Sequence, residues 1–112
     1  MKYALLIYQV PGAVEKLSGE EQEVSQREYM AIAQAPGVVG GEGLQGIETA
    51  TTVRFQDGKK LVTDGPFAET KEVFGGFYLL EADDLDRAIE VASRIPAVRQ
   101  GGSVEVRPIL EM

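Results

Sequence analysis

The spacing of hydrophobic and polar residues changes several times along the chain, and each change predicts a different element. Residues 2–10 are almost continuously apolar, which is typical of a central strand covered on both faces. Ser18 and Glu21 have the spacing of a capping box, in which the side chain of each residue bonds to the backbone N–H of the other. We therefore expect a helix that begins at Ser18 and runs to about Ala35, where a Pro-Gly pair ends it.

The middle of the chain predicts β structure. Residues 38–44 are rich in glycine and are expected to form only an irregular strand. Residues 51–55 alternate in polarity, Asp57-Gly58 is a strong signal for a two-residue turn, and residues 60–63 run back, so the three segments predict a hairpin. A further strand is expected at residues 74–81.

A second helix and a last strand complete the pattern. Asp83-Asp84 is typical of a helix N-cap, and Pro96 is expected to end the helix. The apolar residues at helical spacing on one face are Leu85, Ala88, Ile89, Ala92 and Ile95. Residues 103–109 alternate again, and Pro108 suits an edge strand because proline lacks a backbone N–H.

The predicted order is strand, helix, irregular strand, hairpin, strand, helix and strand, over a single domain at 1–112. It predicts an α+β fold of the ferredoxin-like kind, a sandwich with both helices on one face of an antiparallel sheet. Several strands carry large apolar residues on both sides, so the other face of the sheet would stay exposed in one chain. We therefore expect a homodimer in which a second copy covers that face.

Charge and hydropathy exclude several partners. The 112 residues include 18 acidic and 11 scattered basic residues and give a net charge of −7, so we expect no direct binding to nucleic acid. The apolar run at the N-terminus breaks at Tyr8-Gln9 with no cleavage pattern, and no other run is long enough to span a membrane. We expect neither a signal peptide nor a membrane partner.

The chain has no cysteine and no histidine. These absences remove disulfides, thiolate nucleophiles and the commonest metal ligand, so we expect a cytoplasmic protein without a metal, in which Asp, Glu, Lys or Tyr must carry any proton transfer. Residues 41–46 match the GxGxxG pattern of dinucleotide sites, but a strand-like sequence follows where that motif needs a helix. We therefore expect no cofactor.

The stretch VTDGPFAETKE, residues 62–72, is the densest group of candidate site residues. Asp64 ends the second strand of the predicted hairpin and precedes Gly65 and Pro66. It has two interpretations. Its carboxylate caps the turn, as is common in Asp-Gly-Pro sequences, or it is a catalytic proton acceptor at the end of a rigid strand.

The neighbours of Asp64 share this ambiguity. In a site, Phe67 would exclude water from the carboxylate, and Glu69, Thr70 and Lys71 would orient a polar ligand. In a simple loop, these polar residues would form a solvated rim. Tyr8 lies at the end of the first predicted strand, where its hydroxyl is a further candidate for ligand binding.

Six segments together resemble the YCII-related family, in its DGPF-type branch. They are KYALLIY, GEGL, ATTVR, VTDGPFAETKE, GGFYLLE and GSVEVRP, and their order and approximate spacing are those of the family over nearly the whole chain. The resemblance implies a ferredoxin-like domain that dimerises through its sheets into a barrel-like assembly. It also implies an active-site cleft in which an aspartate, at the position of Asp64, pairs with a histidine in many members.

The histidine has no counterpart in this chain, so a His-Asp mechanism is excluded and Asp64 would act alone or with Tyr8 or Lys71. Our first hypothesis is a protein that binds a small molecule around Asp64, as a cofactor-free enzyme of proton abstraction or elimination if it turns that ligand over. The alternative is a regulatory module without catalysis, because the resemblance implies a link between DGPF-type proteins and alternative sigma factors. The sequence leaves open whether the chain is an enzyme.

Overall fold

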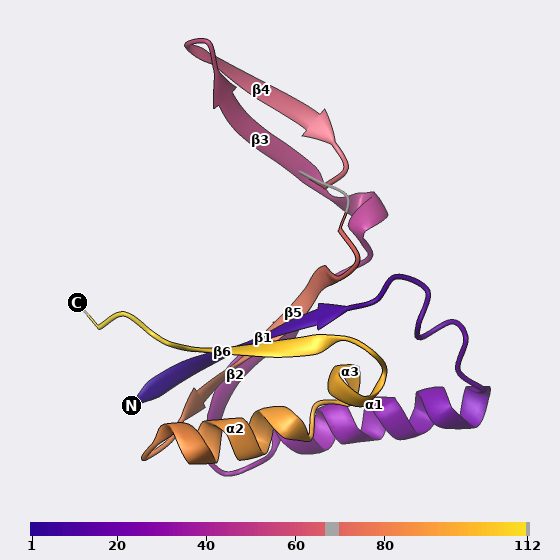
Figure 1. Cartoon of the computed structure of the whole chain (residues 1–112), viewed down its shortest axis with the longest axis vertical. Coiled ribbons are helices and arrows are strands. Elements are labelled where there is room, and N and C mark those ends of the chain that lie inside the picture. Colours follow the sequence, from indigo (N-terminus) through magenta and orange to yellow (C-terminus); the bar gives the residue numbers. More distant parts are fainter. Residues whose placement is uncertain (67–69, 112) are drawn as a thin grey trace.

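A computed structural model describes residues 1–66 and 70–111 of the chain (Figure 1). The elements in chain order are β1 (Lys2–Gln9), α1 (Gly19–Ala33), β2 (Val38–Gly43), the 3-10 turn η1 (Ile47–Thr49), β3 (Thr51–Gln56), β4 (Lys59–Asp64), β5 (Val73–Glu81), α2 (Leu85–Ser93), α3 (Pro96–Arg99) and β6 (Ser103–Pro108).

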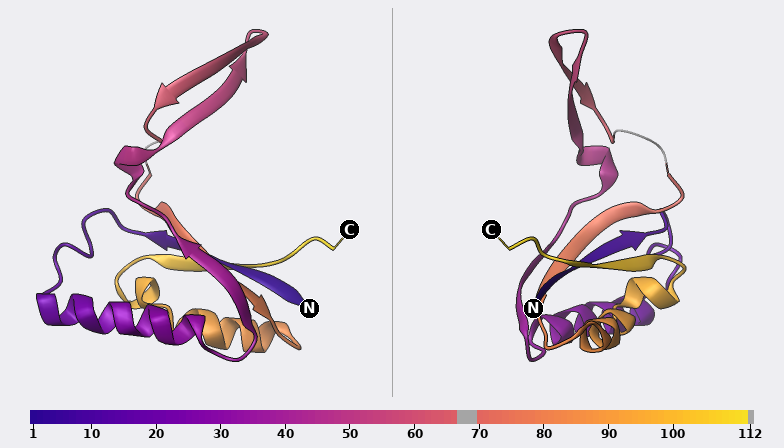
Figure 2. Two further views of the ribbon diagram at one scale, coloured as in Figure 1. Left: turned by 180° about the vertical axis from the view of Figure 1, so that it is seen from behind. Right: turned by 60° about the vertical axis from the view of Figure 1, so that its left-hand side comes forward.

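Four strands form an antiparallel sheet in the order β2-β5-β1-β6, and the helices lie on one face of it (Figures 1 and 2). This arrangement confirms the α+β fold with an antiparallel sheet and is consistent with the ferredoxin-like prediction. Strand β1 lies between β5 and β6, as its apolar sequence predicted, and β6 with its Pro108 lies at an edge.

The core lies between the sheet and the helices. On β1, the side chains of Tyr3, Leu5 and Ile7 are buried, whereas the alternate residues Ala4 and Leu6 are only half-buried. Alternation places the first set on the helix face and the second set on the opposite face. The buried apolar residues of the core are Tyr3, Leu5, Ile7, Ile32, Tyr78, Leu80, Ala82, Ala88, Val91, Ala92, Ile95 and Ala97.

The strands β2 and β5 approach each other unusually closely at their glycines. Gly41 and Gly76 have φ values of +152° and +159°, and a Cβ atom on Gly41 would lie 2.5 Å from the carbonyl oxygen of Phe77. The pairing of β2 with β5 also shifts register between Val38 and Gly40. These irregularities confirm the prediction of an irregular strand at residues 38–44.

Helix α1 begins with the predicted capping box. The Ser18 hydroxyl accepts from the Glu21 N–H at 3.1 Å, and the Glu21 carboxylate accepts from the Ser18 N–H at 3.2 Å. The helix ends with Gln34 as its C-cap, and it buries Ser25 and Ile32 against the core. Gln100 donates to the Ser25 hydroxyl at 2.8 Å, so this buried polar group is satisfied.

Helix α2 begins as predicted, with the Asp84 carboxylate accepting from the N–H of Arg87 at 2.9 Å. Its predicted apolar face is partly wrong, because Leu85 and Ile89 are each 50% exposed, while Val91, which was not assigned to that face, is fully buried. The helix turns Ala88 and Val91 toward the sheet. Small core residues let α2 approach the strands closely, and that approach sets the buried face.

Helix α2 ends before Pro96, as predicted, and its last residue is Ser93. Pro96 also begins the separate short helix α3, which was not predicted, and at the first position of that helix its missing N–H costs nothing.

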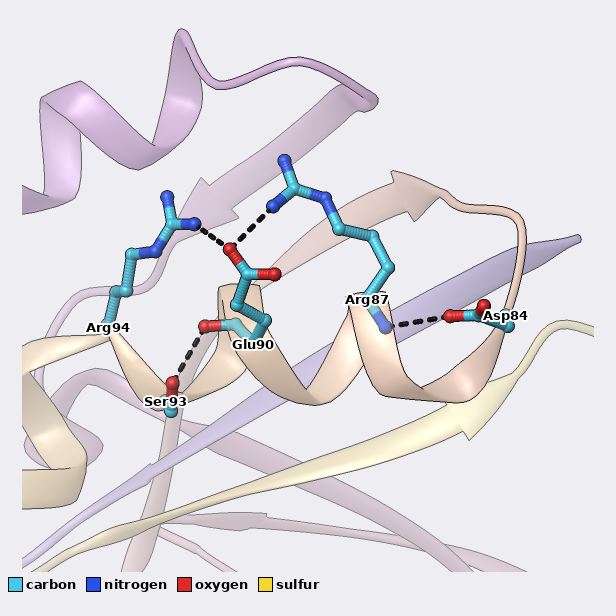
Figure 3. Close-up of polar contacts among 5 residues, drawn as sticks. All are labelled: Asp84, Arg87, Glu90, Ser93 and Arg94. Carbon is cyan, nitrogen blue, oxygen red and sulfur yellow. Dashed lines mark hydrogen bonds and ion pairs between the residues drawn. The ribbon is translucent and has the colours of Figure 1, made fainter.

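The outer face of α2 is polar (Figure 3). Glu90 accepts from Arg87 at 2.9 Å and also from Arg94, and the Ser93 hydroxyl donates to the Glu90 carbonyl at 2.7 Å. These side chains are exposed or half-exposed, so their pairing contributes little to folding.

The predicted hairpin is confirmed as β3–β4, but it projects away from the sheet (Figures 1 and 2). Every residue of β4 is exposed, and Thr52 is the only residue of β3 that is partly buried. Asp57 and Gly58 form the turn with φ values of +53° and +76°.

Candidate functional site

Asp64 is the last residue of β4 and lies at the base of the projecting hairpin, opposite Thr51. Its side chain is exposed, and no hydrogen bond or ion pair joins its carboxylate to another residue of the described ranges. The turn that follows is held by the backbone instead. Gly65, at φ +96°, donates to the Ala50 carbonyl at 2.7 Å, and its own carbonyl accepts from the Thr52 hydroxyl at 2.7 Å. The carboxylate is therefore not engaged in capping this turn.

The loop between β4 and β5 contains the other predicted site residues. Phe67 and Glu69 lie outside the described residues. Thr70 and Lys71 are exposed, and the Thr70 hydroxyl donates to the carbonyl oxygen of Glu72. Thr70 is therefore turned toward its own loop.

Tyr8 lies on the face of the sheet that carries no helix. Its ring packs against Phe74 with centroids 5.6 Å apart and a tilt of 56°. The same end of the sheet is closed by Ser103, which is opposite Tyr8 in the register and donates to the Glu72 carboxylate at 2.8 Å. The structure thus places Tyr8 in a small aromatic and polar cluster at the end of β1.

The structure brings these predicted residues to one end of the molecule but not into contact. The end of β1, the start of β5 and the base of the hairpin lie at the same end of the sheet (Figures 1 and 2). Among residues 1–66 and 70–111, no hydrogen bond, ring contact or cleft of those identified joins Tyr8 to Asp64.

The largest of the clefts found opens at this same end, on the helix side of the sheet. We call it the β2–β5 cleft. It has a volume of about 600 Å³ and is lined by Ile7, Gln9, Gln26, Tyr29, Gly41, Glu42, Gly43, Leu44, Gly75, Gly76, Phe77 and Tyr78. Clefts that hold small molecules usually measure about 300–1,000 Å³ and are mostly apolar with a few polar groups.

Two tyrosines form the inner wall of the β2–β5 cleft. The Tyr78 hydroxyl donates to the backbone carbonyl of Tyr29 at 2.7 Å, and burial, with a smaller contribution from Tyr29, raises the pKa of Tyr78 to about 12. Tyr78 is therefore a neutral hydrogen-bond donor at neutral pH. The Tyr29 hydroxyl oxygen is also buried, and within the described part of the chain it has no hydrogen-bond partner. A buried polar group without a partner is costly and requires an explanation.

The glycines give the cleft its width. Gly43 lines the cleft in ordinary strand conformation, and a Cβ atom built on it would meet nothing within 4 Å. On the facing strand, a Cβ on Gly75 would lie 2.5 Å from the side-chain oxygen of Gln9. The absent side chains leave backbone amides and the Gln9 side chain at the surface of the cleft.

In residues 1–66 and 70–111, no group of three or more acidic side chains is placed to hold a metal ion. No described helix is long and apolar enough to cross a membrane.

Tyr29 and the β2–β5 cleft were not among the features predicted from the sequence. The signal that could have indicated the cleft is the presence of two glycine-rich segments, Gly40-Gly41 and Gly75-Gly76, on strands that pair with each other. Nothing in the sequence of α1 distinguishes Tyr29 from an ordinary core aromatic.

Comparison with known proteins gives two matches over the full domain. Residues 1–112 match the YCII-related domain. The chain is also similar to an uncharacterised protein of Rhizobium meliloti (strain 1021), with 37% identity over 114 residues that cover 97% of this chain and 92% of the relative. With the antiparallel α+β fold described above, these matches show that the chain belongs to the YCII-related family.

Proposed function

We propose that this YCII-related protein binds a small organic molecule in the β2–β5 cleft. The observation that carries the proposal is the buried Tyr29 hydroxyl, which has no hydrogen-bond partner in the described ranges, on a residue that lines a cleft of about 600 Å³. A ligand that fills the cleft and pairs with this hydroxyl would remove the cost of leaving it unpaired.

The walls of the cleft indicate the chemical class of that ligand. Ile7 and Leu44 provide apolar surface, and the side chains of Gln9 and Gln26 provide neutral donors and acceptors. The lining residues include no basic side chain that could pair with an anion, and their one acidic residue, Glu42, is exposed and lies opposite Phe77 in the register, so that its side chain belongs to the helix-free face. The cleft therefore fits a neutral molecule with an aromatic or otherwise flat apolar part and one or two hydrogen-bonding groups, and it disfavours an anion.

The test of binding compares two glycine substitutions. Gly43→Val would place a side chain in the cleft, because the space beside a Cβ at Gly43 is empty and the backbone angle is ordinary. Gly19→Ala is the matched control, since Gly19 also has open space and an ordinary backbone angle but lies at the start of α1. Amide shifts on titration with phenol and with benzamide measure binding, and Gly43→Val should weaken it at least tenfold while the control leaves it unchanged.

Tyr29→Phe separates a binding role from a structural one. The variant removes only the hydroxyl that lacks a partner, so the free protein should be as stable as the native one or slightly more stable. Binding of benzamide should fall by about tenfold, which corresponds to the loss of one good hydrogen bond. Unchanged binding in both Tyr29→Phe and Gly43→Val would reject the cleft as the ligand site.

A finer proposal concerns the reaction. We propose that Asp64, in a DGPF-type arrangement with Thr70 and Lys71 beside it in the chain, acts as a proton acceptor toward a molecule bound at this end of the sheet. The support is the exposed carboxylate of Asp64, which no other described residue engages, at the base of the hairpin above the cleft end of the sheet. Tyr8, and the residues Phe67 and Glu69 outside the described ranges, remain proposed contacts of that molecule.

This reaction is tested with a carbon acid. The protein should accelerate the exchange of hydrogen for deuterium at the central carbon of acetylacetone in D₂O, and Asp64→Asn should abolish the acceleration, because the amide cannot accept the proton. Equal exchange rates with the native protein, with Asp64→Asn and with buffer alone would remove the catalytic role but leave ligand binding untouched.

The assembly is part of the same proposal. We propose that a second copy covers the helix-free face of the sheet, because Ala4, Leu6, Phe77 and Leu79 are half-buried there and form an apolar surface that no described element covers. A solution mass of one chain at micromolar concentration would reject this part of the proposal.

A further inference from the structure

The projecting hairpin has one apolar face. Val53 lies opposite Val62, and Phe55 lies opposite Lys60 on the same face, since directly paired residues of antiparallel strands share a face and alternate residues return to it. Val53, Phe55 and Val62 are 62%, 77% and 53% exposed. The other face is mostly polar and contains Leu61 as its apolar residue.

The hairpin has no cover among the described elements, and the chain exposes more surface than a compact protein of its mass. A two-stranded hairpin that packs on nothing is marginally stable at best. The surface of the chain is 7917 Å², whereas a compact protein of 12.1 kDa exposes about 6,000 Å². The radius of gyration is likewise 15.8 Å, against about 13 Å for a compact chain of this length. The excess of about 1,900 Å² is more than the roughly 800 Å² that each partner buries in a stable interface.

We infer that the Val53–Phe55–Val62 face of the hairpin packs on the helix-free sheet face of a second copy of this chain. The chain itself offers the complementary surface, because that sheet face is apolar at Leu6 and Phe77 and has no cover among the described elements. A copy of the chain therefore supplies both halves of the contact, and two-fold symmetry buries two hairpins at once.

Charge supports a second copy as the occupant. The hairpin, residues 51–64, carries three basic and two acidic residues, while the rest of the chain carries eight basic and sixteen acidic residues. Lys59 and Lys60 are at its tip. Glu42 and Glu105 border the helix-free sheet face, since they are opposite Phe77 and Leu6 in the register. A hairpin with basic tips thus meets an acidic rim.

The inference extends the proposed homodimer and rests on it. It also bears on Asp64, which shares the apolar face of the hairpin because it lies two residues beyond Val62 on β4. Docking of the hairpin would place Asp64 at the border of the interface, so the partner copy would contribute to the surroundings of this carboxylate.

The first experiment measures the dimer dissociation constant by sedimentation equilibrium. The triple variant Val53→Thr, Phe55→Thr and Val62→Thr keeps β-branched residues in the strands and removes the apolar face. It should weaken the dimer by about 100-fold, while the fold of the body, followed by circular dichroism, is retained. Single substitutions give a matched control, because Val62→Thr and Leu61→Thr are neighbours on opposite faces, and only Val62→Thr should weaken the dimer.

The second experiment locates the hairpin on its partner. The chain has no cysteine, so Lys59→Cys gives a single attachment site for a nitroxide label on the polar side of the hairpin tip. Labelled unenriched protein is mixed with unlabelled ¹⁵N-enriched protein. The label should broaden the amide signals of Leu6, Phe77 and Glu105 in the enriched copy.

The outcomes separate this inference from the proposals above. If the native protein is a dimer and the triple variant dimerises with the same dissociation constant, the hairpin contact is overturned and the homodimer proposal stands. If the native protein is a monomer, both the hairpin contact and the homodimer are overturned, and the apolar face of the hairpin would have to bind a different protein. Binding of benzamide in the β2–β5 cleft is measured independently, so its success or failure decides neither result.

Discussion

The body of the molecule and the β3–β4 hairpin are built from similar sequence patterns but differ in what they bury. In the body, alternation on β1 places Tyr3, Leu5 and Ile7 under the helices with at most 5% exposure. In the hairpin, the same alternation places Val53 and Phe55 on one face with at least 62% exposure. A period of two therefore determines which residues share a face, and it does not determine whether that face is covered.

The difference also shows where stability arises. In the body, one set of the alternating side chains is buried under the helices, and burial of apolar area is the main favourable term in folding. The hairpin has its cross-strand hydrogen bonds and a favourable turn, and it gains little burial within one chain. Its order must then depend on contacts that a single chain does not contain, which is why we assign the hairpin to an interface.

The largest effect is expected from the same substitution made in the two regions. Leu80→Ala removes a side chain that is 1% exposed and should lower the free energy of unfolding by about 2–5 kcal/mol, because it leaves a cavity in the core. Leu61→Ala, at 40% exposure on the polar face of the hairpin, should cost less than about 0.5 kcal/mol. Urea unfolding of both variants checks the comparison, and similar losses would show that the hairpin packs on its own body.

The elements that could be predicted from the sequence are those with local signals. Ser18 and Glu21 set the start of α1, Asp84 sets the start of α2, and Asp57-Gly58 sets the hairpin turn, because each acts through neighbours in the chain. The succession of elements along the chain predicted the α+β sandwich with an antiparallel sheet.

The parts that could not be predicted depend on distant contacts. The buried face of α2 includes Val91 and omits Ile89, since the approach of the helix to the sheet selects it. The separation of α3 from α2 depends on the same packing. The candidate site behaves in the same way, because the Tyr29 hydroxyl is conspicuous only once α1 lies on the sheet and closes the β2–β5 cleft. Asp64 was identified from a motif, and its exposure depends on where the hairpin points.

A second prediction uses glycine positions with positive φ in the two regions. Gly37 has φ +89°, and a Cβ there would lie 2.4 Å from the Glu81 carbonyl oxygen, so Gly37→Ala should cost at least about 2 kcal/mol of unfolding free energy. Gly58 has φ +76° with open space around it, so Gly58→Ala strains only the turn of the hairpin. The midpoint of thermal unfolding, followed by the circular dichroism of the helices, should fall clearly for Gly37→Ala and should change little for Gly58→Ala. An equal fall for Gly58→Ala would mean that the hairpin and the body unfold as one unit.

A third prediction concerns pH, and it applies to the body because Tyr78 is buried there. Burial raises the pKa of Tyr78 from 10.0 to about 12, so the unfolded chain loses this proton at lower pH than the folded one. The contribution of the neutral phenol to the free energy of unfolding is fully present below pH 10. As the pH rises from 10 toward 12, the free energy of unfolding should fall by about 1–2 kcal/mol. The measurement is the urea midpoint at the two ends of this range in the native protein and in Tyr78→Phe. Identical pH dependence in both would contradict the assignment.

The smallest effect is expected at the N-terminus of α1. Ser18→Ala removes the acceptor of the Glu21 N–H, which is bonded at 3.1 Å, and should cost about 1 kcal/mol of unfolding free energy. This contact is as local as the turn of the hairpin, yet its loss should appear in the unfolding of the whole body, because α1 is anchored to the sheet through Ile32. Ser18→Asp is the control, since aspartate also caps a helix and should restore most of the loss. The contrary result would be faster amide exchange in the first turn of α1 with an unchanged urea midpoint. The start of α1 would then unfold independently of the body, as we expect of the hairpin. The boundary between the two regions would in that case lie within α1.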